Sequence, residues 1–267
     1  MATGRMRFYS LSLSGQTNIT YVLPNDVPPM MTMGNPCFQR PTKALYLLHG
    51  ISGNDCDWEF TGNAEDLSMR FNLAFFMITC GNDFYLDREA TGRQYCQFAG
   101  KEVIDYTRKT FGLSERAEDT IIGGLSMGGF GALHTALAYP DTFGAVIALS
   151  SALVIHNIAG MKPGAFDGIA NEAYYREVFG DLDKVAESDN NPEVLYDRLA
   201  VAGAHIPPIY MAVGTEDFLY GANQEFRRFL EKRHADLRYE EGPGVHNWDF
   251  WNPYMIKGVE WALGRLE

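Results

Sequence analysis

The sequence predicts an α/β protein with a mostly parallel central sheet that helices cover on both faces. Several segments that read as strands are apolar along their whole length, which is typical of strands buried on both faces. Segments with apolar residues at helical spacing alternate with these strands along the chain. Near the N-terminus polar and apolar residues alternate instead, which predicts an antiparallel edge to the sheet.

The first half of the chain carries this edge and then two buried strands. Residues 6–15 and 16–24 are expected to form two antiparallel strands that meet near Gly15, and a proline-rich loop follows them. Next come a buried strand, a helix with Asn63 as its N-cap, a second buried strand and a helix that ends at Gly112. These four elements are expected at residues 43–50, 63–72, 73–80 and 95–112.

The second half repeats the alternation of strand and helix. An apolar strand enters a helix that ends near Pro140, and residues 152–205 are polar and irregular, with helical pieces such as EAYYREVFG. Because this irregular segment leaves the carboxyl edge of the sheet, it is expected to form a cap-like insertion over a site at that edge. The remaining strands are expected at residues 143–152, 207–214 and 237–244, and the remaining helices at residues 223–234 and 251–266.

Composition and charge limit the classes of function. A chain of 267 residues with 46% hydrophobic residues is long enough for one domain, residues 1–267, with a sizeable core. The formal net charge of −12 and the lack of a Lys/Arg cluster argue against nucleic acid and membrane surfaces as partners. No signal-like segment opens the chain, and no apolar run approaches the roughly 18 residues of a membrane span. The four cysteines lack CxxC spacing, so we expect reduced thiols in a cytoplasmic protein.

Residues 124–128, Gly-Leu-Ser-Met-Gly, form a G-x-S-x-G motif between an apolar strand and a run of helix formers. A sharp turn from strand to helix strains its central residue and brings the neighbouring backbone close, so the flanking positions must be glycine. The turn lifts the serine hydroxyl clear of the sheet and aims the helix N-terminus at the group it attacks. A phosphate-binding P-loop needs Lys and then Ser or Thr after its last glycine, and Phe130 stands there instead. Ser126 is therefore the candidate nucleophile.

A serine nucleophile needs a base to remove its proton and a carboxylate to orient that base. In hydrolases with this motif the acid and then the base follow the serine along the chain. His246 follows the last short strand, in a glycine-rich loop at the carboxyl edge, and is the candidate base. Asp217 follows the preceding strand and is the candidate acid, with Glu216 as the alternative. His134 lies eight residues into the motif helix, roughly 12 Å along its axis, and is too far from Ser126.

The tetrahedral intermediate of acyl transfer needs two N–H donors for its oxyanion. One is expected from Met127, the residue after the nucleophile. The other is expected from the loop after the first buried strand, where Ile51 is the candidate and Ser52 the alternative. Gly50 lets that backbone approach the substrate, and His49 is expected to brace the loop by hydrogen bonding rather than to act as a base.

Four segments in this order, LYLLHGISGN, IIGGLSMGGFGAL, VGTEDFL and GVHNWDFW, resemble the putative-esterase (esterase D-like) group of α/β-hydrolases. The resemblance covers about residues 5–265 and is strongest to tributyrin esterases and related short-chain acyl esterases, including feruloyl and acetyl-xylan esterases. It implies the α/β-hydrolase fold, with Ser126, Asp217 and His246 as nucleophile, acid and base. S-formylglutathione hydrolases of this group typically carry a Tyr-Asp-His-Ser-type segment where this chain has Gly-Val-His-Asn-Trp, which argues against glutathione thioesters.

The sequence thus predicts a serine carboxylesterase that hydrolyses short-chain acyl esters, from acetyl to butyryl, through an acyl-enzyme intermediate. Aryl, feruloyl and acetyl-sugar esters fall within this range of substrates. The partner is a small-molecule ester, and the mechanism requires neither a metal nor an organic cofactor. Aromatic residues near the candidate triad are expected to line the acyl and alcohol pockets: Trp58, Tyr85, Phe218 and Trp248.

Other functions on the same residues stay open. The triad also suits a thioesterase of the S-formylglutathione hydrolase type, or an acyltransferase whose insertion excludes water in favour of an alcohol or a sugar. A non-catalytic binding module with a hydrolase fold is a further alternative, but it gives no reason for a full triad beside an oxyanion loop. Related esterases often self-associate, so the resemblance also implies a homo-oligomer.

Overall fold

The computed structural model describes residues 1–266, apart from the side chain of Glu89, and contains one eight-stranded sheet. Its strand order is β1-β2-β4-β3-β7-β8-β9-β10. Strand β1 (Ala2–Ser10) pairs antiparallel with β2 (Gly15–Leu23), which pairs antiparallel with β4 (Leu73–Ile78), and all other neighbours are parallel. The other strands of this eight-stranded sheet are β3 (Lys43–Leu48), β7 (Thr120–Leu125), β8 (Ala145–Leu149), β9 (Ile209–Gly214) and β10 (Leu237–Gly242). The predicted mostly parallel sheet with an antiparallel N-terminal edge is confirmed.

The burial of each strand agrees with its sequence pattern. Every residue of the five central strands β3, β4, β7, β8 and β9 is buried, as their continuous apolar sequence predicts. The edge strand β1 alternates instead: Phe8 is buried, whereas its neighbour Tyr9 is exposed. One face of this edge therefore packs on the core while the other meets solvent.

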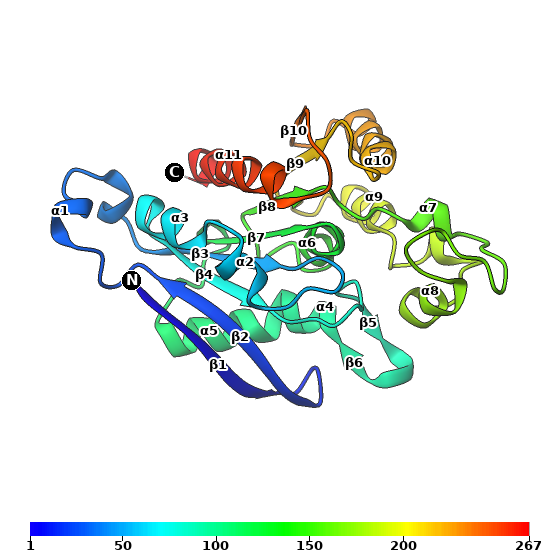
Figure 1. Cartoon of the computed structure of the whole chain (residues 1–267), viewed down its shortest axis with the longest axis horizontal. Helices are drawn as coiled ribbons and strands as arrows, with labels where there is room; N and C mark the ends of the chain where they lie inside the picture. The colour runs from blue at the N-terminus through cyan, green and yellow to red at the C-terminus, as the bar shows by residue number, and fades with distance from the viewer. Residues whose placement is uncertain (267) are drawn as a thin grey trace.

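Helices cover both faces of the sheet (Figure 1). On one face, α5 and α6 contribute Val103 and Phe130 to a large apolar cluster, and on the other, α3 and α11 contribute Leu67 and Met255 to a second cluster. No helix within residues 1–266 has the length and apolar character needed to cross a membrane. The α-helices are α1 (Pro29–Thr32), α2 (Asp57–Phe60), α3 (Ala64–Phe71), α4 (Tyr95–Gln97), α5 (Val103–Phe111), α6 (Met127–Ala138), α7 (Ile155–Ile158), α8 (Glu172–Phe179), α9 (Pro192–Ala202), α10 (Tyr220–Lys232) and α11 (Trp248–Leu266).

The predicted helix over residues 95–112 is divided in three. A π-helical turn, Phe98–Glu102, separates α4 from α5, and Gly112 ends α5 in the left-handed conformation, as expected of a C-cap. A Cβ atom on Gly100 would lie 2.2 Å from the ring of Tyr139, so this turn approaches α6 too closely for any side chain. Asn63 does precede α3, but its side chain donates to the carbonyl oxygen of Asn252 instead of capping the helix.

The segment between β8 and β9 holds α7, α8, a 3-10 turn at Val185–Glu187, and α9. In Figure 1, α7 and α8 lie beyond one end of the sheet, away from α1 and the N-terminus. The predicted helical piece EAYYREVFG forms α8, and the side chain of Asn171 caps it by accepting the N–H of Tyr174. This segment, residues 150–208, is called the insertion below.

At the end of the sheet opposite the carboxyl ends of the parallel strands, Lys43 at the start of β3 holds three segments together. Its buried ammonium group lies 2.6 Å from the carboxylate of Asp119 and donates to the carbonyl oxygens of Glu118 and Leu266. Burying a charge is costly unless it is paired and hydrogen-bonded, and here both conditions are met. The end of α11 is thus tied to the strand that begins the parallel part of the sheet.

A second buried charge joins the antiparallel edge to the loop after β3. The carboxylate of Asp55 accepts two hydrogen bonds from Arg5, each 2.7 Å long, and others from Thr20 and Thr79. Burial alone would raise the pKa of Asp55, but hydrogen bonds from Arg5, Thr79 and Thr20 outweigh it and hold the pKa below its usual range. The loop after β3 is therefore pinned to β1, β2 and the end of β4.

Replacing Asp55 with Ala should lower the free energy of unfolding by about 2–3 kcal/mol, because four donors lose a charged acceptor. Asp66→Ala is the matched control, since Asp66 also pairs with an arginine but on the exposed face of α3. This control should change the free energy of unfolding by less than about 0.5 kcal/mol. Chemical denaturation monitored by circular dichroism measures both, and equal effects would contradict the structural role given to Asp55.

Candidate active site

Ser126 sits at the turn from β7 into α6, where the backbone is strained. Its φ of 56° and ψ of −120° are uncommon for any residue other than glycine. Two main-chain hydrogen bonds hold it there: its N–H donates to Leu149, and its carbonyl oxygen accepts the N–H of Ala152, each at 2.9 Å. Ser126 is only 6% exposed, so a substrate can reach its side chain only from the carboxyl edge of the sheet.

The glycines of the motif give this turn its space. A Cβ atom on Gly124 would lie 2.3 Å from the carbonyl oxygen of Gly128, and one on Gly128 would lie 2.2 Å from that of Leu48. Farther along α6, a Cβ atom on Gly131 would lie 2.4 Å from the ring of Tyr85. Backbone cannot move aside as a flexible side chain can, so the two flanking positions of the motif require glycine.

Asp217 and His246 meet at the same edge of the sheet, after β9 and β10. Nδ1 of His246 lies 2.8 Å from Oδ2 of Asp217, and Oδ1 accepts the N–H of Leu219, also at 2.8 Å. Burial alone would raise the pKa of Asp217, but the hydrogen bonds that its carboxylate accepts from His246 and Leu219 lower it. An ionised Asp217 can only accept, so Nδ1 carries the proton and Nε2 of His246 is left with a lone pair.

Glu216, the alternative acid, has a different contact. Its carboxylate accepts the N–H of Gly244 at 2.6 Å, and its own N–H donates to the carbonyl oxygen of Gly244. A Cβ atom on Gly214 would lie 2.1 Å from that same carbonyl oxygen, so the two loops pack backbone against backbone. Glu216 thus holds the loop that carries His246, whereas Asp217 contacts the imidazole itself.

His49 and His134 are both buried and engaged elsewhere. His49 accepts the N–H of Cys80 at Nε2, so its Nδ1 carries a proton and donates to the carbonyl oxygen of Gly50 at 2.7 Å. Burial lowers the pKa of His49, which therefore favours the neutral ring that these two bonds require. This is the bracing role that the sequence predicts for His49.

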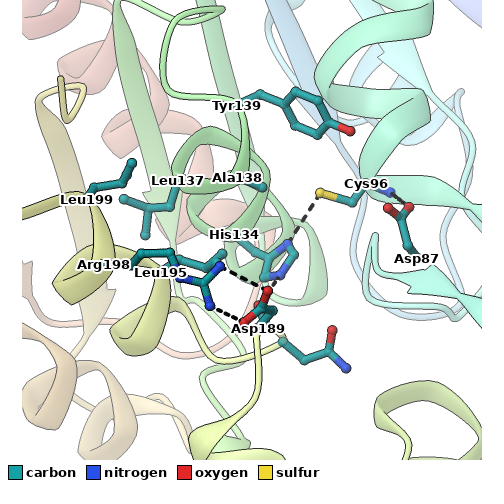
Figure 2. Close-up of a pocket in the computed structure, with 11 residues that line it drawn as sticks. Asp87, Cys96, His134, Leu137, Ala138, Tyr139, Asp189, Leu195, Arg198 and Leu199 are labelled. Carbon is teal, nitrogen blue, oxygen red and sulfur yellow. Dashed lines mark hydrogen bonds and ion pairs between the residues drawn. The ribbon is translucent and has the colours of Figure 1, made fainter. Parts of the chain in front are cut away.

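His134 lies at the back of a cavity of about 440 Å³ between α4, α6 and α9 (Figure 2). Its Nε2 lies 2.9 Å from the carbonyl oxygen of Asp189, and its Nδ1 lies 3.5 Å from the sulfur of Cys96. Leu137, Leu195 and Leu199 form an apolar wall, and Figure 2 shows Arg198 paired with the carboxylate of Asp189 on the far side of the imidazole from Cys96. Both ring nitrogens are occupied, which excludes His134 as the base for Ser126.

The loop of residues 49–53, called the oxyanion loop below, passes beside the nucleophile. A Cβ atom on Gly50 would lie 3.4 Å from the Cβ atom of Ser126. Ser52 donates its N–H to Oδ1 of Asn82 at 2.8 Å and is therefore not free to bind an oxyanion. Within residues 1–266 the N–H of Ile51 has no protein acceptor, and Met127 opens α6, where N–H groups lack partners within the helix.

The four aromatic residues predicted to line the pockets lie at different depths. Trp58 and Tyr85 are each 1% exposed; the indole N–H of Trp58 donates to Leu48, and the Tyr85 hydroxyl bonds to the backbone of His49. Phe218 is 63% exposed, with its ring centroid 4.6 Å from that of His246. Trp248 is half-buried and packs edge-on against Trp58.

Sequence reasoning missed Trp251, whose ring packs edge-on against that of His246 at 4.9 Å. Its indole N–H donates to the hydroxyl of the buried Ser150, whose side chain in turn hydrogen-bonds Asp217. The available signal was the position of Trp251 three residues after Trp248, on the same side of a helix. The two rings indeed pack together at 5.4 Å.

The described residues provide no alternative catalytic centre built on a metal. No group of three His, Cys, Asp or Glu side chains in residues 1–266 is arranged to hold an ion. The cysteines Cys37, Cys56, Cys80 and Cys96 are all free thiols.

Comparisons with known proteins show the family and the fold to which this chain is similar. A family model described as "Putative esterase" matches residues 12–262. An acetyl esterase of Caldicellulosiruptor saccharolyticus is 42% identical over 266 residues, which cover 98% of each chain. Two Staphylococcus aureus structures, the fluorophosphonate-binding serine hydrolase FphF and the S-formylglutathione hydrolase FrmB, are each 26% identical, with TM-scores of 0.83 and 0.82. In both cases the similarity covers 98% of each chain.

The two adjacent carboxylates should respond differently to loss of charge. Asp217→Asn should lower kcat by roughly 10³–10⁴-fold, because an amide favours the wrong tautomer of His246. Glu216→Gln should lower it by less than about 10-fold, because the amide oxygen still accepts the N–H of Gly244. Steady-state hydrolysis of p-nitrophenyl acetate distinguishes the two variants. A larger loss in Glu216→Gln would assign the acid to Glu216.

The buried His134 should make stability depend on pH. Burial lowers its pKa to about 4, whereas an unfolded histidine titrates near 6.5, so between these values only the unfolded chain binds the proton. The free energy of unfolding should therefore fall by about 3 kcal/mol from this group as the pH drops from about 7 to about 4.

Denaturation of wild type and His134→Gln across this range isolates that contribution as the difference between the two slopes. Cys96→Ala is the matched control, because it changes the same cavity but keeps the imidazole, and it should retain the wild-type slope. Parallel slopes for wild type and His134→Gln would contradict the prediction.

Proposed function

The chain belongs to the putative esterase family and is a carboxylic ester hydrolase, and we propose that it cleaves short-chain acyl esters with Ser126 as nucleophile, Asp217 as acid and His246 as base. The observation that carries the proposal is the contact of Nδ1 of His246 with the buried carboxylate of Asp217, at 2.8 Å. It lies at the sheet edge where the strained turn presents Ser126.

In the proposed reaction, Nε2 of His246 removes the proton of the Ser126 hydroxyl as its oxygen attacks the ester carbonyl. The carboxylate of Asp217 stabilises the imidazolium that forms and keeps the ring in one orientation. The imidazolium then gives its proton to the departing alcohol, which leaves the acyl group on Ser126. A water molecule, deprotonated by the same imidazole, releases the acid and restores the serine.

The oxyanion of each tetrahedral intermediate binds the N–H groups of Ile51 and Met127 in this proposal. Support comes from their backbone positions: neither N–H has a partner that it must release, while the neighbouring Ser52 N–H is taken by Asn82. Met127 also begins α6, and the positive end of a helix favours developing negative charge at that place.

Several observations support short acyl chains and a carboxylic ester as the substrate class. The 42% identical relative, matched along its whole length, is an acetyl esterase. The deep aromatic residues Trp58 and Tyr85 are buried and hydrogen-bonded to the protein's own backbone, so their rings offer little surface to a longer acyl chain. The exposed ring of Phe218 offers an apolar contact beside the base for the alcohol part of the ester.

Hydrolysis of S-formylglutathione is the second candidate, because FrmB shares this fold along nearly the whole chain. The same triad cleaves thioesters and oxygen esters by the same steps, so geometry alone does not separate the two. The loop around the base, Gly-Val-His-Asn-Trp in this chain, departs from the segment typical of that group and favours the ester.

Ser126→Ala should lower kcat on p-nitrophenyl acetate by at least about 10⁴-fold and abolish labelling by a fluorophosphonate probe, because no other residue takes the acyl or phosphonyl group. Ser151→Ala is the matched control: Ser151 is also buried, and its hydroxyl has no partner among the described residues. The control should keep both activity and labelling. Turnover at the wild-type rate in Ser126→Ala would refute the proposed nucleophile.

A substrate panel tests the proposed specificity. The value of kcat/KM should fall at least about 10-fold from acetyl to octanoyl p-nitrophenyl esters, because added methylenes find no pocket. S-formylglutathione should be a poorer substrate than the acetyl ester, and added methanol should yield little methyl acetate. Preference for S-formylglutathione would favour the thioesterase, and methyl acetate as the main product would favour the acyltransferase.

A further inference from the structure

We propose that Asn82 is a positioning residue for the oxyanion loop, and that helix α8 of the insertion holds Asn82 in place. The proposal rests on the proposed function, because it concerns how the N–H of Ile51 is aimed at the oxyanion. It gives the insertion a part in the chemical step, in addition to any part in covering the site.

The oxyanion loop has little structure of its own. Its one internal main-chain hydrogen bond runs from the N–H of Gly53 to the carbonyl oxygen of Gly50 at 3.1 Å. Ser52 has a φ of 65°, a left-handed conformation that costs free energy for a residue with a side chain. Such a conformation persists only where neighbouring groups enforce it.

Asn82 supplies the enforcing contact. Its side-chain oxygen accepts the N–H of Ser52 at 2.8 Å. The peptide between Ile51 and Ser52 is planar, so fixing the N–H of Ser52 also fixes the carbonyl group of Ile51 and limits rotation at its Cα atom. The N–H of Ile51 lies two rotatable bonds farther back, so this contact limits the directions that the N–H can take.

Asn82 belongs to residues 80–88, which are called the brace segment. Other residues of this segment support the start of the oxyanion loop. Cys80 donates its N–H to Nε2 of His49, and the hydroxyl of Tyr85 accepts the N–H of His49 at 2.9 Å. Phe84 and Tyr85 both have positive φ values, so the brace segment turns sharply between these contacts. It therefore holds the oxyanion loop at two places, His49 and Ser52.

Helix α8 in turn holds the brace segment. The hydroxyl of Tyr174 donates to the main-chain oxygen of Asn82 at 2.6 Å, and Glu177 pairs with Arg88. Tyr174 and Glu177 are three residues apart, so they project from one side of α8. Burial raises the pKa of Tyr174, which keeps its hydroxyl protonated and able to donate.

An apolar contact completes the attachment of α8. The ring of Phe84 packs against that of Phe179, at the end of α8, at 4.9 Å and against that of Phe130 of α6 at 5.4 Å. A series of contacts therefore joins the insertion to the oxyanion loop, from Tyr174 to Asn82 and from Asn82 to Ser52. Removing either of these contacts should let the Ile51 N–H adopt a wider range of directions, while the proposed triad stays in place.

The test compares Asn82→Ala, Tyr174→Phe and the double variant by steady-state kinetics on p-nitrophenyl acetate. Asn82→Ala should lower kcat by about 10–50-fold with KM changed less than about 3-fold, because the oxyanion contact forms only in the transition state. Tyr174→Phe should lower kcat by about 3–5-fold. Because both act through the same loop, the double variant should be no slower than Asn82→Ala alone.

Asn54→Ala is the matched control, since Asn54 also accepts a main-chain N–H within the loop after β3, that of Cys56 at 2.8 Å. It should keep kcat within about 2-fold of wild type. As a second readout, affinity for a trifluoromethyl ketone, which forms a tetrahedral adduct, should fall in Asn82→Ala by the same factor as kcat, with affinity for acetate unchanged.

Three results would overturn the proposal. They are wild-type kcat in Asn82→Ala, equal losses of ketone and acetate affinity in that variant, or losses that multiply in the double variant. If Asn82→Ala does not fold, wild-type kcat in Tyr174→Phe overturns it instead. Ser126→Ala run in the same assay separates this failure from failure of the proposed function, which alone predicts that this variant is inactive.

Discussion

The strained turn at Ser126 is the constraint on which the rest of the site depends. The chain must pass from the last residue of β7 into the first turn of α6 within one residue, which only a positive φ at Ser126 permits. The turn in turn requires glycine at 124 and 128, because main-chain atoms of Gly128 and Leu48 occupy the space of a side chain. The first turn of α6 is thereby pressed against the end of β3, which brings the oxyanion loop beside the serine.

Parallel strands explain how distant parts of the chain meet this turn. Each of β3, β7, β9 and β10 releases its loop at one edge, so residues near 50, 126, 217 and 246 converge there. Two hydrogen bonds between Glu216 and Gly244 join the last two loops, one to the carboxylate of Glu216 and one between main-chain groups, and Asp217 and His246 meet beside them. Asp217 thus contacts a histidine whose loop is held by Glu216, its neighbour in sequence.

Most elements of the fold were predictable because their signals are local. Continuous apolar runs specify the buried strands, and the glycine spacing specifies the turn at Ser126. Sequence spacing did not explain why Asp217 rather than Glu216 contacts His246, since adjacent residues at a strand end differ only in the direction that their side chains take. Asn82 was also out of reach, because its partners lie 30 and 92 positions away and no sequence spacing relates them. Such contacts depend on how the finished loops pack, which propensity does not encode.

The link between Lys43 and the carbonyl oxygen of Leu266 joins positions 223 residues apart. A chain made from its N-terminus on the ribosome exposes β3 long before α11, so Lys43 lacks one of its acceptors until α11 has been made. His246 arrives nearly as late, just before α11. Ser126 therefore emerges long before His246, and a nascent chain lacks the proposed triad until residue 246 has left the ribosome.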